Sequence, residues 1–130
     1  MRILAIDYGR KKIGLAISND KVAEPKSVIR YKYVKEVLAK ISEVIENEKI
    51  ERVVVGISEG KMEMESRSFA RALREIIKVP VVTYDETLST HDAQNLSIKA
   101  GLKRKKRKNL EDAYAAAIML QNYLDSNAQN

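Results

Sequence analysis

Residues 2–18 read RILAIDYGRKKIGLAIS, two short apolar runs on either side of a turn. The first run is Ile3–Ile6 and the second is Ile13–Ile17. Short β-rich runs around a glycine-containing turn predict a β-hairpin. Asp7 stands where the first run stops, so the hairpin places a carboxylate at the end of a buried strand. Taken alone, Asp7 has an ordinary explanation as a side chain that stabilises the turn.

Beyond the hairpin, the spacing of apolar residues predicts strands that alternate with amphipathic helices. Pro25 favours an edge strand or a bulge in its segment. Antiparallel strands followed by βαβ crossovers predict an α/β fold with a mixed sheet flanked by helices. In chain order the expected elements are a strand around Pro25 within 22–33, a helix over 34–49, a strand over 52–57, a helix over 69–77, a strand over 81–84, a helix from Ser89 or Thr90 to about Lys99, and a helix over 110–124.

The composition favours one cytoplasmic domain. The 130 residues contain no cysteine, so disulfides and thiolate metal sites are excluded. No apolar stretch is long enough to span a bilayer, and the N-terminus lacks a signal-peptide pattern. Neither a repeat nor a linker interrupts the chain. We therefore expect a single domain over residues 1–130 with a frayed polar tail at 126–130.

The net charge of +6 is concentrated in one block. The chain has 24 basic and 18 acidic residues, and a run of six consecutive cations accounts for the whole excess. Such a block repels itself, so we expect it to lie outside regular secondary structure. It is either a solvated loop or a segment that contacts nucleic-acid phosphates. Its members are Lys103, Arg104, Lys105, Lys106, Arg107 and Lys108.

Acidic residues recur where predicted strands end and where the last predicted helix begins. They are Asp7, the pair Asp85-Glu86 and the pair Glu111-Asp112. Each has an ordinary explanation in a turn or in a first helical turn. Parallel strands bring their carboxyl ends to one edge of a sheet, where ligands bind. Three converging carboxylates would repel each other unless they bind a hard divalent cation such as Mg²⁺, with which phosphodiester hydrolysis is possible.

Four stretches in this order resemble the YqgF family, also called RuvX-like Holliday junction resolvases. They are IDYGRKKIGLAIS, VVVG, DETLST and KKRKNLEDAYAAAIMLQNYL, and the resemblance covers nearly the whole chain. It implies a ribonuclease H-like α/β fold, with five strands in the order 3-2-1-4-5 and helices on both faces. It also implies a magnesium-dependent nuclease, with manganese as a possible substitute, that processes the 5′ end of pre-16S ribosomal RNA in ribosome biogenesis.

The resemblance also implies roles for individual residues. The acids that match the family's motifs are Asp7, Glu86 and Asp112, as metal ligands and catalytic residues, with Asp85 and Glu111 as second choices. Strand alternation sends Asp85 and Glu86 to opposite faces, so one of the two should reach the metal. The cations expected to hold nucleic acid are Arg10, Lys11 and Lys12 in the turn and Lys103, Arg104, Lys105, Lys106, Arg107 and Lys108 in the block.

The chain departs from the family pattern at two places. Ile57-Ser58-Glu59-Gly60 replaces a proline-containing loop, and Thr87 stands where an arginine is usual. Both changes put a substrate contact in question. His91, the one histidine, is either a proton donor to the leaving group or a structural residue at a helix start.

Three other functions remain open on the sequence. A structure-specific endonuclease for branched DNA is expected to need a dimer to cut two strands symmetrically. A non-catalytic RNA-binding factor in ribosome assembly would keep the acids for stability. A nucleotide-binding domain related to actin-like ATPases is disfavoured, because the chain has no second Asp-x-Gly phosphate loop.

Overall fold

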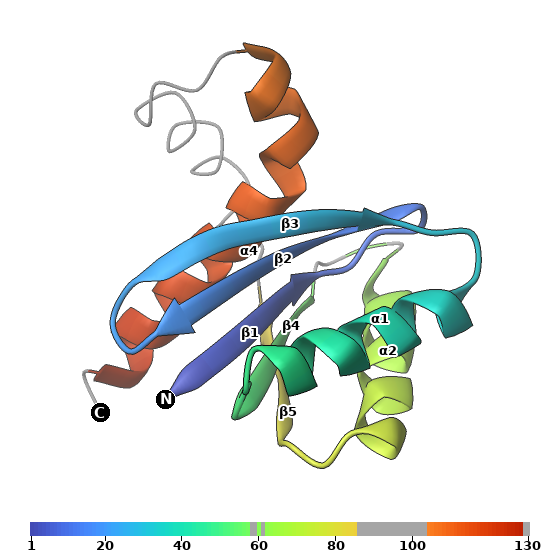
Figure 1. Ribbon diagram of the computed structural model, residues 1–130, viewed down its shortest axis with the longest axis horizontal. Coiled ribbons are helices and arrows are strands. Elements are labelled where there is room, and N and C mark those ends of the chain that lie inside the picture. Colours follow the sequence, from blue (N-terminus) through green and yellow to red (C-terminus); the bar gives the residue numbers. More distant parts are fainter. Residues whose placement is uncertain (58–59, 61, 86–103, 129–130) are drawn as a thin grey trace.

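The computed structural model describes residues 1–57, 60, 62–85 and 104–128, with the backbone alone for 104–109 and 127–128 (Figure 1). The predicted helix from Ser89 or Thr90 to Lys99 lies outside these residues. The described elements, in chain order, are β1 (Arg2–Asp7), β2 (Lys12–Asn19), β3 (Ala23–Arg30), α1 (Val34–Asn47), β4 (Arg52–Ile57), α2 (Glu63–Ile76), β5 (Val81–Asp85) and α4 (Arg104–Ala128).

The five strands form one mixed sheet in the order β3-β2-β1-β4-β5. The β1–β2 and β2–β3 pairs are antiparallel, whereas the β1–β4 and β4–β5 pairs are parallel. The predicted α/β class, ribonuclease H-like strand order and opening hairpin are therefore confirmed. The carboxyl ends of β1, β4 and β5 lie at one edge of the sheet, because these three strands run in the same direction.

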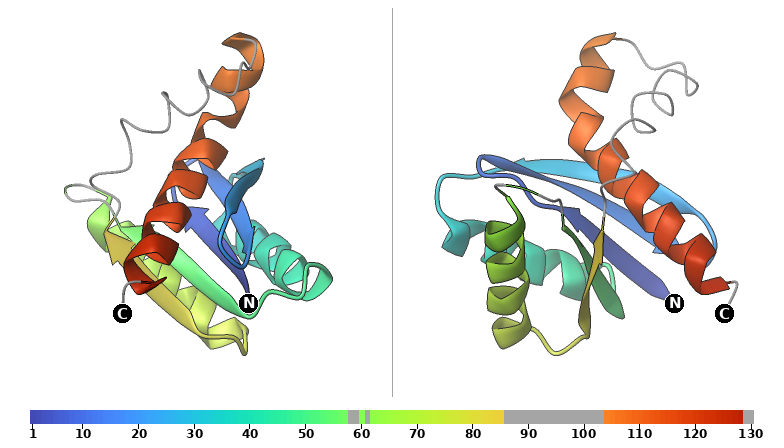
Figure 2. Two further views of the ribbon diagram at one scale, coloured as in Figure 1. Left: turned by 90° about the vertical axis from the view of Figure 1, so that its left-hand side faces the viewer. Right: turned by 180° about the vertical axis from the view of Figure 1, so that it is seen from behind.

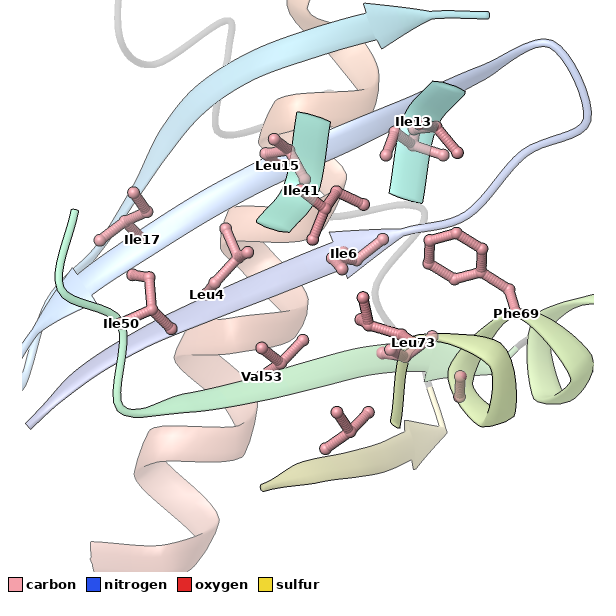
Figure 3. Close-up of a cluster of buried hydrophobic side chains, with 14 of the residues drawn as sticks. Leu4, Ile6, Ile13, Leu15, Ile17, Ile41, Ile50, Val53, Phe69 and Leu73 are labelled. Carbon is pink, nitrogen blue, oxygen red and sulfur yellow. The ribbon is translucent and has the colours of Figure 1, made fainter. Parts of the chain in front are cut away.

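Side-chain alternation along β1 divides the apolar residues between two cores. Leu4 and Ile6 join a core with α1 and α2, whereas Ile3 and Ala5 join a second core with α4. Figures 1 and 2 show α1 and α2 on one face of the sheet and α4 on the other. Figure 3 shows the first core, in which the side chains of Ile41, Phe69 and Leu73 meet those of the strands. Both faces of the central strands are thus covered.

Two helices form because their apolar residues recur at spacings of three and four. In α1 the buried residues are Val37 and Ile41, and in α2 they include Phe69 and Leu73. The α1 prediction is confirmed within two residues at its end. The α2 helix begins at Glu63, earlier than the predicted Phe69. Its first turn is acidic, which favours a helix N-terminus but gives no apolar periodicity to detect.

The segment around Pro25 is an edge strand, and the ladder between β2 and β3 shifts register between Leu15 and Ala16. Pro25 pairs with Ala16 directly after that shift. Proline has no backbone N–H to donate to a ladder hydrogen bond, and an edge strand has a neighbour on one side alone, so proline is tolerated here. The sequence prediction of an edge strand or a bulge is confirmed on both counts.

The last helix is longer than the sequence predicted. It runs from Arg104 to Ala128, whereas apolar periodicity predicted 110–124. Residues Arg104–Lys108 of the cationic block are therefore helical, and the prediction that they lie outside regular structure is wrong; Lys103 is outside the described residues. Lysine and arginine favour helix intrinsically, and these turns project past the sheet (Figure 1). None of the described helices has the length and apolar character that crossing a membrane would require.

Candidate active site

Asp7 is the last residue of β1 and lies between two glycines of the sheet. It pairs with Gly14 on β2 and with Gly56 on β4. Alternation along β1 places Asp7 on the same face as Ile3 and Ala5, which is the face covered by α4. The residue is half-buried. Its carboxylate therefore belongs to the α4 side of the strand edge.

Gly14 is the point at which α4 rests on this edge. A Cβ at Gly14 would lie 2.7 Å from the backbone nitrogen of Ala113 and would overlap the carbonyl of Asp112. Only glycine permits so close an approach of helix backbone to strand. Directly paired residues of antiparallel strands project to the same face, so the Asp112 backbone lies beside Asp7. The contact brings the backbone of α4 against the strand that pairs with Asp7.

A second contact fixes α4 farther along the sheet. The Gln121 side chain accepts a hydrogen bond from the backbone N–H of Ala23 at 2.9 Å and donates one to the carbonyl of Lys21 at 2.9 Å. Lys21 lies in the connection between β2 and β3, and Ala23 is the first residue of β3. Between these anchors the buried residues Ala116, Met119 and Leu120 pack against the sheet. The backbone of Asp112 is thereby held at a fixed position.

The Asp112 carboxylate is paired with a lysine of the opening hairpin. Lys12 Nζ lies 3.1 Å from Asp112 Oδ2, and the two side chains are 41% and 32% exposed. Lys12 is the first residue of β2 and stands two residues before Gly14, so both project to the α4 face. The sequence predicted Lys12 as a phosphate contact, and the pairing with a proposed metal ligand was not foreseen.

Arg10 is paired on the other side of the sheet. Its guanidinium lies 2.9 Å from Glu65 Oε1 on α2, and hydrogen bonding to that carboxylate holds the pKa of Arg10 above its ordinary value. The sequence did not indicate Glu65 as a partner of Arg10, because the two residues are far apart in the chain. Lys11, between the two paired cations, is exposed. Of the three predicted turn cations, the outer two thus have carboxylate partners on opposite faces.

The turn that carries these cations is supported by two tyrosines. The Tyr8 ring stacks on Phe69 with ring centroids 4.6 Å apart. The Tyr31 hydroxyl donates a hydrogen bond to the Gly9 carbonyl, and the Tyr31 backbone N–H donates to the Lys11 carbonyl at 3.0 Å. Burial, followed by interaction with Tyr8, raises the pKa of Tyr31 above its ordinary range. These contacts fix the residues directly after Asp7.

Asp85 lies on the opposite face from Asp7. It is the last residue of β5 and shares its face with Val81, which packs in the core of α1 and α2. It also borders a pocket of about 230 Å³ with Glu63 and Arg67 of α2. The second-choice residue Asp85 is therefore separated by the sheet from Asp7 and Asp112. Glu86, Thr87 and His91 lie outside the described residues, and Glu111 is half-buried on α4.

The donor chemistry at this edge fits a hard divalent cation. Asp7 and Asp112 both supply carboxylate oxygens, and Mg²⁺ binds through one or two carboxylates while it keeps several waters. Asp112 already attracts positive charge, since it holds the Lys12 ammonium. Within residues 1–57, 60, 62–85 and 104–128, no three acidic or histidine side chains form a group that would hold an ion.

Comparison with protein families and curated sequences gives consistent matches over nearly the whole chain. The model of the family RuvX, described as Holliday junction resolvase, matches residues 1–126. A Syntrophomonas wolfei protein is 38% identical over 133 residues, covering 96% of this chain and 94% of its own. A Halothermothrix orenii protein is 40% identical over 134 residues, covering 96% and 95%. Both relatives carry the name "Putative pre-16S rRNA nuclease".

Solved structures share the fold at low sequence identity. RuvC of T. thermophilus in complex with Holliday junction substrate superposes with a TM-score of 0.65 at 20% identity, covering 98% of this chain and 96% of its own. The Fowlpox virus resolvase in complex with Holliday junction DNA superposes with a TM-score of 0.65 at 15% identity, covering 97% and 98%. This likeness identifies the fold as that of the RuvC-type resolvases.

Proposed function

This chain belongs to the RuvX family, and we propose that it is a metal-dependent nuclease that processes the 5′ end of pre-16S ribosomal RNA. Residues 1–130 would act as a single nuclease domain in the cytoplasm. The proposed substrate is taken from the name that the sequence relatives carry. The observation that supports the site is the contact of Gly14 with Asp112, which brings a second carboxylate to the edge where Asp7 ends β1.

In this proposal Asp7, Asp112 and Glu86 hold magnesium, with manganese as a substitute. Asp85 lies on the other face of the sheet, which supports Glu86 as the candidate from that pair. When bound, the ion supplies the Lewis acid for phosphodiester hydrolysis. Water adds to the phosphorus and loses a proton, the bond to the leaving oxygen breaks, and that oxygen takes up a proton, so that protons balance.

The cationic residues hold the substrate backbone in this proposal. Lys11 is exposed on the turn beside Asp7, and the block at 103–108 precedes Asp112 on the same segment of chain. The helical part of the block, Arg104–Lys108, projects beyond the sheet (Figure 2). Clustered lysine and arginine bind phosphates with release of counterions, so they would contribute affinity without sequence specificity.

A second candidate function is cleavage of four-way DNA junctions. It is favoured by the description of the matching family and by the junction complexes among the structural neighbours. Symmetrical cleavage of two strands would need two copies of the chain related by a two-fold axis. The two functions use the same carboxylates but differ in substrate and in the number of copies required.

One experiment separates these functions. Wild type and the Asp7→Asn variant are each incubated with pre-16S RNA and with four-way junction DNA, with magnesium and with a chelator. RNA cleavage that needs magnesium and is lost in Asp7→Asn supports the proposal. Cleavage of the junction alone would favour the resolvase function. Tight RNA binding without cleavage of either substrate would instead identify a non-catalytic assembly factor.

A further inference from the structure

Lys12 and Asp112 form an ion pair whose main chains are both fixed. Lys12 begins β2 and pairs with Arg30 of β3, and Asp112 is held where its backbone contacts Gly14. The distance of 3.1 Å between Lys12 Nζ and Asp112 Oδ2 therefore depends on the two side chains alone. Both are partly exposed, at 41% and 32%, so the ammonium can leave the carboxylate for solvent without movement of the sheet or helix.

The pair occupies an oxygen that the proposed metal site requires. A divalent cation on Oδ2 would stand within a few ångströms of the Lys12 ammonium, and like charges so close repel each other strongly. The lysine side chain is a flexible four-carbon stem with a strongly hydrated end, which makes its release inexpensive. An ion and the Lys12 ammonium would thus compete for the same carboxylate oxygen.

We propose that Lys12 is the resident counter-ion of Asp112, and that a divalent cation displaces its ammonium when the site is loaded. Lys12 then neutralises the Asp112 carboxylate before the cation arrives and competes with the cation for the same oxygen. This inference rests on the proposed function, because it takes Asp112 as a ligand. It assigns Lys12 a role different from the phosphate contact that the sequence predicted.

The test measures cation affinity and requires no cleavage. Magnesium and manganese are titrated by calorimetry into wild type, Lys12→Met, Lys12→Arg and Lys11→Met at 0.15 M ionic strength. An exposed ion pair is worth little, so Lys12→Met should bind the cation about two- to fivefold more tightly. Lys12→Arg retains a cationic partner for Asp112 and should bind no more tightly than wild type. Lys11→Met removes the same charge one residue away and should change affinity less than Lys12→Met.

Several outcomes would overturn the proposal. Weaker cation binding by Lys12→Met would show that Lys12 stabilises the loaded site. An equal gain in cation affinity in Lys11→Met and Lys12→Met would show that the effect comes from net charge and not from the ion pair with Asp112. Equal cation affinity of wild type and Asp112→Asn would show that Asp112 is not a ligand and would overturn the inference. The proposed function would then still stand if cleavage needs magnesium and is lost in Asp7→Asn. A wild type that binds neither cation would overturn both this inference and the proposed metal dependence. Thermal unfolding confirms that each variant is folded.

Discussion

The backbone of Asp112 rests on Gly14, where a side chain as small as a methyl group would overlap the Asp112 carbonyl. Gly14 is also the strand partner of Asp7. A single glycine thus sets the separation between the last helix and the strand that carries the first carboxylate. Geometry at the candidate site therefore depends on a residue that has no side chain.

Replacement of Gly14 by alanine should destabilise the fold by about 1–3 kcal/mol, the usual cost of an added methyl group in packed surroundings. The strain falls between β2 and α4, so amide protection against hydrogen exchange should decrease more in α4 than in α1. Chemical denaturation measures the first effect, and α1 serves as an internal control for the second. An unchanged free energy of unfolding would show that the α4 backbone can move away from residue 14 without loss of stability.

The two faces of the sheet give Asp7 and Asp85 different expected roles. Asp7→Asn should reduce magnesium-dependent cleavage by about 100-fold or more, since it alters a proposed metal ligand. Asp85→Asn makes the same chemical change at the end of β5, a parallel strand separated from β1 by β4, but on the α2 side. It should leave the cleavage rate within a few-fold of wild type. Equal losses in the two variants would contradict the assignment of the site to the α4 face.

Neutralisation of the cationic block should flatten the salt dependence of nucleic-acid binding. The double variant Lys105→Gln/Lys106→Gln should lower the slope of log K against log salt by about 1.5, if each lysine neutralises one phosphate. The double variant Lys35→Gln/Lys40→Gln removes the same charge from exposed positions of α1, on the other face. Fluorescence anisotropy over a salt series measures both. An equal change in the two slopes would indicate a general effect of charge.

Tyr31 should make the fold sensitive to alkaline pH. The pKa of Tyr31 in the folded protein lies above its ordinary value of 10.0, chiefly because the ring is buried. The unfolded chain therefore ionises first, so this stabilising contribution is present below pH 10 and is lost as the pH rises above 10. Tyr31→Phe should cost about 1 kcal/mol at neutral pH through the lost hydrogen bond to Gly9 and should weaken the alkaline decline.

The matched control for Tyr31 is Tyr33→Phe, which removes a hydroxyl from a side chain that is 67% exposed. It should leave both the stability at neutral pH and the alkaline decline unchanged. Urea denaturation at a series of pH values from 7 to 11 measures both variants. A wild-type decline that persists undiminished in Tyr31→Phe would assign it to other groups.

Much of the fold was predictable because burial imposes a period on the sequence. The runs Ile3–Ile6 and Ile13–Ile17 became paired strands, and Pro25 marked the edge strand. Helix ends were less predictable, since the acidic first turn of α2 carries no apolar residue that the core requires. The prediction for Arg104–Lys108 was wrong, because repulsion within a cationic block does not prevent helix formation when the helix continues into a packed segment.

The candidate site was predictable in its residue types and less so in its contacts. Asp7 and Asp112 were chosen from motifs, and their proximity follows from strand order and the glycine contact. The carboxylate partners of Arg10 and Lys12 could not be foreseen, since both lie on helices far along the chain. Which side chains meet across such separations depends on packing, and no local pattern records it.

The packing of α4 against β1, β2 and β3 affects when this face of the core can form during translation. Asp7 is synthesised with the first strand, but the helix that covers this face of the core and carries Asp112 is synthesised after all five strands. A domain generally folds as a unit, so the α4 face of the sheet would stay uncovered until this helix has been made. A chain truncated before α4 would therefore carry Asp7 without the helix whose backbone contacts Gly14.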